Sequence, residues 1–246
     1  AATAQLTGID LDLTNNKIYW SDDNSDQIHR CDLNGSNSET LLTNIGLSLP
    51  RGIDVDDTNH KLYWVDAATD KIHRSNQDGT TVELVAALSG GEGPSDIFVD
   101  IANDKMYWTE TGAGKIRTSA VSSFSASDLI TGLSQPRGLD VDLTNNKIYW
   151  TELASNPDRI QRADLDGSNV ENILYNFGMS NPHGVDLDLT NNKVYWVENG
   201  GNRILKNNLD GSLVEVILTG LSTPRDLALD LTNNKIYFTD AGDNSI

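Results

Sequence analysis

One octapeptide recurs along the chain, and this repetition constrains the fold more than any other feature. LTNNKIYW stands at 13–20 and returns unchanged at 143–150, with close copies at 57–64, 101–108, 189–196 and 231–238. A repeat with a period of about 20 to 50 residues is typical of solenoids and propellers, in which each unit packs against its neighbours. We therefore expect a stack or ring of six like units.

Each unit reads as four β-strands. The first unit alternates over 9–13, turns at 14–16, continues with β-forming residues at 17–20, and adds strands near 27–30 and 39–42 around Asn34-Gly35, a strong hairpin signal. The units open near Gly8, Gly52, Asp96, Gly138, Gly184 and Asp226, so the spacing is 42 to 46 residues. The pattern predicts an all-β fold over 1–246, a single six-bladed β-propeller of four-stranded antiparallel blades.

The last unit is incomplete in this chain. It stops at Ile246, where its third strand would begin, and 1–7 align with the segment that leads into the second unit. A propeller normally avoids an open half-blade because its strand edges remain unpaired. We expect an incomplete sixth blade here and a native polypeptide that continues for half a repeat.

Charge excludes several functional classes. Thirty-six acidic residues against 18 basic ones give a formal net charge of −18 over 246 residues, a field that repels nucleic acid and anionic lipid. No apolar run is long enough to span a membrane. The single cysteine, Cys31, excludes an internal disulfide, and its neighbour His29 forms no repeated pair with it, so we expect no thiol catalysis.

Residues present in every unit are expected to serve the scaffold. A tyrosine and a following tryptophan or phenylalanine point to opposite faces of a strand, so they should pack against opposite neighbouring blades. The acid before each hairpin should accept backbone N–H groups of the turn. These acids are Asp12, Asp56, Asp100, Asp142, Asp188 and Asp230.

The repeated motif resembles that of a known family. Tyr-Trp-Thr-Glu at 107–110 and 149–152, Tyr-Trp-Ser-Asp at 19–22 and Tyr-Phe-Thr-Asp at 237–240 resemble YWTD, and Asp-Leu-Asp-Gly-Ser at 164–168 and the Pro-Arg-Gly lead-in accompany them. The chain is thus similar to the class B (YWTD) repeats of the low-density lipoprotein receptor family. This resemblance implies a six-bladed propeller that binds proteins or peptides on the face bearing the lead-in loops, and an extracellular or secreted location. The cysteine-rich module that follows the propeller in receptors is not found.

A first set of varying residues is expected near the central channel. Four units carry an acid two residues after the opening position, Asp10, Asp54, Asp140 and Asp186, whereas Phe98 and Ala228 replace it in the other two. If these side chains face the channel, four carboxylates converge and could hold Ca²⁺. The alternative is that each carboxylate accepts hydrogen bonds from backbone amides or channel water.

A second varying set precedes each opening position, and we call its members the lead-in residues. They are Thr7, Arg51, Ser95, Arg137, His183 and Arg225. Arginine grips carboxylates in bidentate fashion, so Arg51, Arg137, His183 and Arg225 are candidates for a docking face for a peptide or an anionic group. The alternative is that each arginine pairs with an acid of the adjoining blade.

These patterns favour a non-catalytic protein- or peptide-binding module with no catalytic residues, no cofactor and no nucleic-acid partner. The alternative is a calcium-dependent hydrolase or lactonase of the six-bladed gluconolactonase or paraoxonase kind, supported only by the converging aspartates. A carbohydrate-binding module would need exposed aromatic side chains, for which Tyr175 and Phe177 are the candidates.

Overall fold

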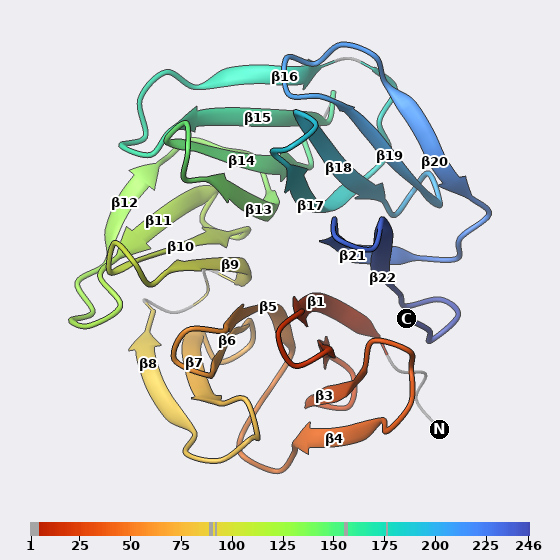
Figure 1. Cartoon of the computed structure of the whole chain (residues 1–246). Helices are drawn as coiled ribbons and strands as arrows, with labels where there is room; N and C mark the ends of the chain where they lie inside the picture. Colours follow the sequence, from red (N-terminus) through yellow and green to blue (C-terminus); the bar gives the residue numbers. More distant parts are fainter. Residues whose placement is uncertain (1–4, 89–90, 92, 155–156, 176) are drawn as a thin grey trace.

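The computed structural model describes residues 5–246 apart from 89–90, 92, 155–156 and 176. Its strands form separate antiparallel sheets arranged around a central axis (Figure 1). In the described part of the chain, five sheets have four strands each, and a sixth has two. Within the described ranges, no helix is long and apolar enough to cross a membrane.

Each blade runs from the central axis outward in chain order. The first blade consists of β1 (Leu6–Asp12), β2 (Lys17–Asp22), β3 (Gln27–Asp32) and β4 (Glu39–Leu42), and the second of β5 (Pro50–Asp56), β6 (Lys61–Asp66), β7 (Lys71–Asn76) and β8 (Glu83–Ala87). The third has β9 (Pro94–Asp100), β10 (Lys105–Glu110), β11 (Lys115–Ser119) and β12 (Ser127–Ile130), and the fourth β13 (Pro136–Asp142), β14 (Lys147–Glu152), β15 (Arg159–Asp164) and β16 (Glu171–Tyr175). The fifth has β17 (Pro182–Asp188), β18 (Lys193–Glu198), β19 (Arg203–Asn208) and β20 (Glu215–Thr219), and the sixth β21 (Pro224–Asp230) and β22 (Lys235–Asp240).

The predicted propeller is confirmed as five complete blades and a partial sixth. The two strands of the sixth blade occupy the ring between β17 and β1, and β1 lies against both of them. The outer strand of the fifth blade is consequently exposed along all five of its residues, because no outer strands of the sixth blade cover it. The inner ring closes, whereas the outer layer stays open at this point.

The recurring octapeptide builds the first hairpin of every blade. The carboxylate of Asp12 accepts the backbone N–H and the side-chain N–H of Asn15, both at 2.7 Å. Asn16 then adopts φ 56°, a left-handed conformation that asparagine tolerates. The same pair of bonds links Asp142 to Asn145 and recurs in the other units. The turn geometry therefore explains why Asp and Asn are repeated.

The aromatic residues join the blades, as predicted. Trp150 of the fourth blade packs with Tyr107 and Ile116 of the third, whereas Tyr149, on the opposite face, packs with Trp196 of the fifth. Tryptophan thus faces the preceding blade and tyrosine faces the following one. Four of these indoles have no exposed surface, namely those of Trp64, Trp108, Trp150 and Trp196.

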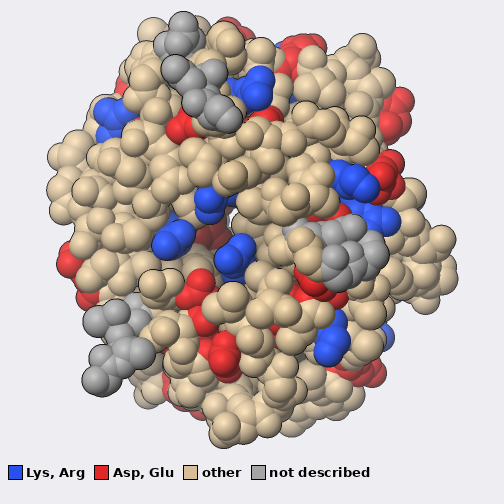
Figure 2. Space-filling view, turned by 180° about the vertical axis from the view of Figure 1, so that it is seen from behind, with Lys and Arg blue, Asp and Glu red and all other residues tan. Residues whose placement is uncertain are grey.

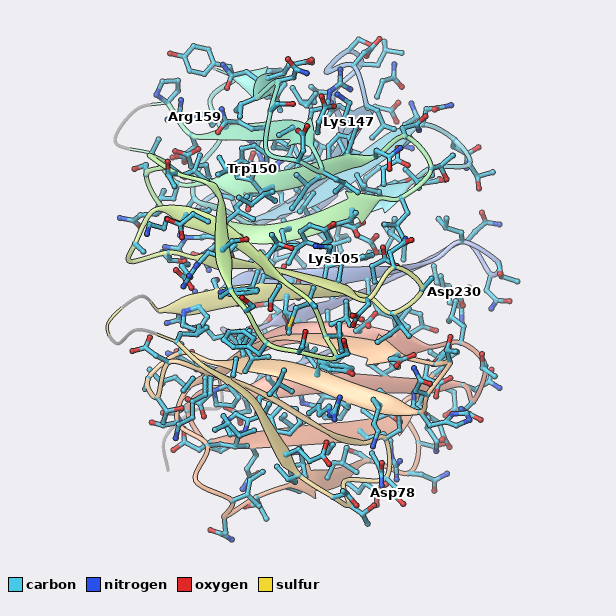
Figure 3. The ribbon with its side chains drawn as sticks, turned by 90° about the vertical axis from the view of Figure 1, so that its left-hand side faces the viewer. Asp78, Lys105, Lys147, Trp150, Arg159 and Asp230 are labelled. Carbon is cyan, nitrogen blue, oxygen red and sulfur yellow. The ribbon has the colours of Figure 1, made fainter. Side chains whose placement is uncertain are left out.

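The ring has two different faces (Figure 3). Seen edge-on, Lys147, Asp230 and Asp78 lie on one side with the hairpin turns, and Arg159 lies on the other. The segments that lead from one blade to the next reach this second face, where Ala67 N–H donates to the Leu49 carbonyl at 3.0 Å. Lead-in loops and the loops between second and third strands therefore share one face.

Removal of an interblade indole should destabilise the ring by an amount set by its burial. Trp150→Ala is expected to cost about 3–5 kcal/mol of unfolding free energy, because a closed interblade core loses its largest side chain. Trp20→Ala is the matched control, since Trp20 is 8% exposed beside the partial sixth blade. Denaturant unfolding should show the smaller loss for Trp20→Ala, and equal losses would contradict this account of packing.

Candidate functional site

A bulge in each innermost strand positions the lead-in residues. The register between β13 and β14 shifts between Pro136 and Leu139, and equivalent shifts occur in the other blades. A bulge leaves residues outside the regular pairing and redirects their side chains. The bulged pair Arg137-Gly138 therefore does not follow the alternation of the strand, and the Arg137 side chain reaches the central cavity.

Hydroxyl groups of the repeated motif fix this bulge to the neighbouring blade. Thr151 Oγ1 accepts the Gly138 N–H of its own blade at 3.1 Å and donates to the His183 carbonyl of the next blade. Thr109 does the same for the Arg137 carbonyl at 2.6 Å. The third position of the YWTD-like motif thus anchors the backbone of a lead-in residue in the next blade.

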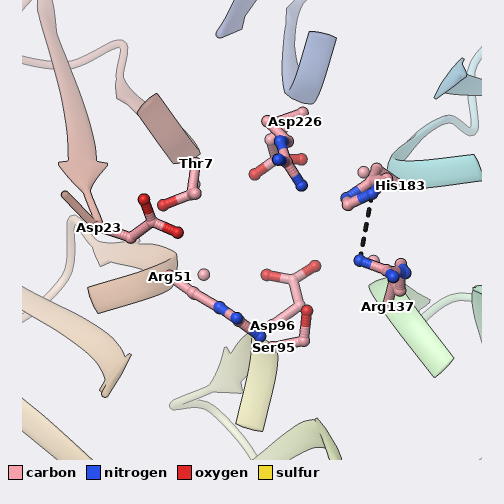
Figure 4. Close-up of a pocket in the computed structure, with 13 residues that line it drawn as sticks. Thr7, Asp23, Arg51, Ser95, Asp96, Arg137, His183 and Asp226 are labelled. Atoms are coloured by element: carbon pink, nitrogen blue, oxygen red, sulfur yellow. Dashed lines mark hydrogen bonds between the residues drawn. The ribbon is translucent and has the colours of Figure 1, made fainter. Parts of the chain in front are cut away.

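The lead-in residues meet at one end of the central channel, in a cavity that we call the mouth. Figure 4 shows Arg51, Arg137 and His183 pointing into it, with Thr7, Ser95 and Asp23 at its edge. Arg225 also lines it, and the cavity volume is about 70 Å³. On this face, blue side chains surround the central opening (Figure 2). All four residues predicted for the binding face are therefore brought together.

Among the described residues, the arginines of the mouth have no ion-pair partner, contrary to the alternative that each pairs with an acid of the adjoining blade. In the described part of the chain, the arginines outside the mouth all form ion pairs, at positions 30, 74, 117, 159, 162 and 203. With the residues that the structure describes, Arg51, Arg137 and Arg225 form none, and the buried Nε atoms of Arg137 and Arg225 have no hydrogen-bond partner there. The mouth thus gathers three arginines that form no ion pair with the described residues.

His183 lies within this cluster as a neutral acceptor. Burial, reinforced by Arg137, Arg225 and Arg51, lowers the pKa of His183 well below its usual value. Arg137 Nη1 lies 3.1 Å from His183 Nε2, so the neutral ring accepts a hydrogen bond from the guanidinium. Burial also lowers the pKa of Arg137 to about 10, with Arg225 and Arg51 adding to the effect. Arg137 therefore remains cationic at neutral pH.

Asp23 lines the mouth beside these cations. Burial raises its pKa, and the charges of Arg51 and Arg225 oppose that rise. Its Oδ1 atom is buried without a hydrogen-bond partner. Asp23 therefore offsets part of the positive potential at one edge of the mouth without forming an ion pair.

Below the mouth, the channel is lined by six carboxylates, two more than predicted. Asp10, Asp54, Asp140 and Asp186 line a cavity of about 280 Å³, as expected for channel-facing residues. In the two blades where Phe98 and Ala228 stand at this position, Asp96 and Asp226 supply the carboxylate from the opening position of the unit. The sequence signal was available: where the opening glycine becomes Asp, the later Asp becomes Phe or Ala.

Each channel carboxylate joins two blades. Asp140 accepts the N–H of Val141 in its own blade at 2.6 Å and that of Leu187 in the next blade at 2.9 Å. Equivalent bonds to the next blade run from Asp10 to Val55, from Asp54 to Val99, from Asp96 to Leu139, from Asp186 to Leu229 and from Asp226 to Ile9. The predicted alternative, in which these acids accept backbone amides, describes the structure.

Crowding in the channel favours the protonated acids. Burial is the main cause that raises the pKa of Asp54 and Asp96 to about 7 and that of Asp186 to about 6. Burial and neighbouring carboxylates raise the pKa values of Asp10, Asp140 and Asp226 well above their usual range. Backbone N–H donors oppose these shifts but do not cancel them.

The channel does not offer the donor set expected for Ca²⁺. Among the described residues, no three carboxylate, imidazole or thiol groups are arranged to hold a metal ion. The carboxylate oxygens of Asp10 and Asp140 already accept backbone N–H groups of two blades. Calcium requires six to eight oxygen ligands, so these aspartates do not fit the role considered for them.

Cys31 and Tyr175 lie outside this site. Cys31 is buried, and burial raises the pKa of its thiol, which disfavours the reactive thiolate. Tyr175 and Phe177 are 52% and 47% exposed where β16 passes into a lead-in loop. They belong to the face of the mouth but not to the mouth itself.

The fold is shared with solved structures of different functions. One chain of a nidogen/laminin complex matches with a TM-score of 0.81 and 22% identity, covering 97% of this chain and 86% of that one. A gluconolactonase from Xanthomonas campestris matches with a TM-score of 0.80 and 17% identity (97% and 84%). Virginiamycin B lyase from Staphylococcus aureus matches with a TM-score of 0.70 and 16% identity (96% and 77%).

Neither a protein-family model nor a curated protein sequence matches the chain. At these identities the likeness shows the propeller fold, and membership of the class B repeat family stays a prediction. The function must therefore be argued from the site.

The channel acids should make stability fall as pH rises. The pKa of Asp54 is about 7 in the folded protein and about 3.9 in an unfolded chain. The protonated side chain therefore contributes its full stabilisation of the folded state below about pH 4, and this stabilisation is lost as pH rises through 7. Asp54→Asn keeps an acceptor for the Val99 N–H and cannot ionise. Between about pH 4 and 7, the free energy of unfolding of the variant should rise relative to that of the native protein by up to about 1.4 kcal/mol per pH unit.

Urea unfolding at several pH values measures this difference. Asp166→Asn is the matched control, because Asn34 fills the same turn position in the first unit and hydrogen bonds from Ser168 lower the Asp166 pKa. The difference in unfolding free energy between Asp166→Asn and the native protein should not grow between pH 4 and 7. The same pH dependence in both variants would contradict the assignment of the effect to the channel acids.

Calcium should leave the stability of the protein unchanged. After EDTA treatment, excess Ca²⁺ is expected to produce no shift in the thermal midpoint, because burial favours the protonated forms of the channel aspartates and no three such groups among the described residues are arranged to hold a metal ion. A site filled a hundredfold above its dissociation constant would add about 2.7 kcal/mol. A rise of that size, abolished by Asp54→Ala or Asp140→Ala, would restore the metal hypothesis.

Proposed function

We propose that this propeller is a non-catalytic protein- or peptide-binding module whose mouth receives an acidic group of its partner. It acts outside the cell, in keeping with its resemblance to the class B repeats. The observation that carries the proposal is the cluster of Arg51, Arg137 and Arg225, which lacks ion-pair partners in the described structure although the protein carries a net charge of −18.

An acidic ligand group would satisfy donors that the folded chain leaves unpaired. A buried polar group without a hydrogen bond costs about 1–3 kcal/mol, and more when it is charged. The Nε–H groups of Arg137 and Arg225 are in this position. Hydrogen bonds from a guanidinium to a carboxylate are charge-assisted and strong, so capture of one anion turns an unfavourable arrangement into a specific contact.

The surface around the mouth can supply apolar contacts. Ile45 and Leu49, 41% and 37% exposed, precede Arg51 in the first lead-in segment, and Phe177 lies in a later one. Aromatic and aliphatic side chains around a charged anchor are typical of protein interfaces. The partner is thus expected to carry apolar residues beside its acidic group.

The surroundings of His183 support a binding role over catalysis. A catalytic imidazole needs a hydroxyl, water or substrate proton to accept and is oriented by a second group. In the described structure, the hydrogen-bond partner of the His183 ring is the Arg137 guanidinium, a donor that stays protonated at neutral pH. His183 therefore orients Arg137 in this proposal.

Selection from a random peptide library tests the proposal. Peptides that bind the native protein should share an acidic residue, and Arg51→Gln/Arg137→Gln/Arg225→Gln should weaken them by at least about tenfold, which is 1.4 kcal/mol. Lys61→Gln/Lys105→Gln/Lys235→Gln is the matched control, because it removes the same charge from the hairpin face.

Binding measured by biolayer interferometry should be retained in the lysine control. Equal weakening in both triple variants would attribute binding to net charge alone. Selected peptides without an acidic residue would contradict the proposed role of the mouth.

A further inference from the structure

Two aspartates form the boundary between the mouth and the channel, and we call them the floor. Asp96 and Asp226 line both cavities, whereas Asp10, Asp54 and Asp140 line only the channel. They come from the third and sixth blades, which stand opposite each other in the ring (Figure 1). Figure 4 shows both among the arginines of the mouth.

The fold leaves space for these two carboxylates. The preceding blades carry Gly52 and Gly184 beside them, and a Cβ atom there would come within 2.3 Å of Asp96 Oδ1 and 1.9 Å of Asp226 Oδ1. Real Cβ contacts are never this short, so a larger residue would displace the floor. In the third and sixth blades the carboxylate therefore stands at the opening position only because the preceding blade has glycine beside it.

The floor oxygens retain hydrogen-bonding capacity toward the mouth. Asp96 accepts the N–H of Ile97 at 2.9 Å and that of Leu139 at 2.8 Å, one on each oxygen. Asp226 accepts the N–H of Leu227 at 2.9 Å and that of Ile9 at 3.1 Å in the same way. A carboxylate oxygen has two lone pairs, so each keeps one site after its backbone bond.

Charged groups of opposite sign face the floor from its two sides. From the mouth it faces the guanidinium groups of Arg51, Arg137 and Arg225, the neutral ring of His183 and the carboxyl of Asp23. From the channel it faces the other carboxyls, Asp10, Asp54, Asp140 and Asp186. An anion that enters the mouth therefore meets arginines around it and acids beneath it.

We propose that the mouth recognises a carboxyl group, held by an arginine through one oxygen and by a proton shared with Asp96 or Asp226 through the other. The inference rests on the proposed function and names the group that the partner inserts: an aspartate or glutamate side chain or a chain terminus. The two oxygens of a planar carboxylate can contact one arginine and one floor acid. A tetrahedral phosphate would place an additional charged oxygen against the acids.

The shared proton makes binding depend on pH with a defined sign. Burial raises the pKa of Asp96 to about 7 and that of Asp226 well above the usual value for aspartate. Below these pKa values the floor donates a hydrogen bond; above them an ionised floor repels the ligand. Affinity should therefore weaken as pH rises through 7, by up to about tenfold per pH unit for each proton lost.

Titration with acetate, the simplest carboxylate probe, tests this assignment. The Nε–H resonances of Arg137 and Arg225, followed by NMR at constant ionic strength with chloride, should shift at saturating acetate at about pH 5.5 and much less at about pH 8.5, while acetate itself stays ionised. Asp96→Asn/Asp226→Asn should bind acetate with similar affinity at both pH values. Asp10→Asn, which leaves the floor intact, should keep the native pH dependence.

A measurement on the native protein covers the case in which the double variant does not fold. The heat of acetate binding near pH 7, compared between buffers of different ionisation enthalpy, should report net proton uptake, and zero uptake would overturn the shared proton. Tighter binding of inorganic phosphate than of acetate would overturn the carboxyl assignment. Acetate binding without pH dependence would refute this inference and leave the proposed function standing. No binding of acetate or phosphate at any pH would refute both.

Discussion

The inner ring is held together by one carboxylate in each blade. Each of these carboxylates accepts a backbone N–H from the next blade. The innermost strand of a propeller blade is an edge strand, and its unpaired N–H groups face the channel. Asp10 satisfies Val55 in the second blade, and Asp226 satisfies Ile9 in the first. The ring therefore closes at its axis even though the sixth blade has only two strands.

This solution places six acids in a narrow space, and the electrostatics of the site follow from it. Burial raises the pKa values of the channel acids, which favours their protonated forms and reduces the repulsion between them. Among the described residues, the three arginines at one end form no ion pair, whereas Asp96 and Asp226 accept backbone amides of two blades. The acids that hold the inner ring together thus also border the proposed binding site.

Local chemistry made much of this structure predictable. Asp12 and Asn15 form a hairpin turn within one stretch of sequence, and Tyr149 and Trp150 face opposite blades because side chains alternate along a strand. The candidate channel acids and lead-in residues were identified because they vary where the scaffold residues do not. Asp96 was not identified as a channel acid, because it occupies a position that is glycine in most units. The presence of Phe98 two residues later shows that the carboxylate has moved to the opening position in this unit.

The sequence by itself determined the repeat, the four strands of each complete unit and the residues that face each neighbour, because these depend on turns and on a two-residue alternation. Only the tertiary structure decided that Arg51, Arg137 and Arg225 share one cavity without an acidic partner. Bulges release these side chains from the alternation, and ring closure brings together blades that are far apart in the sequence. No local pattern records either effect.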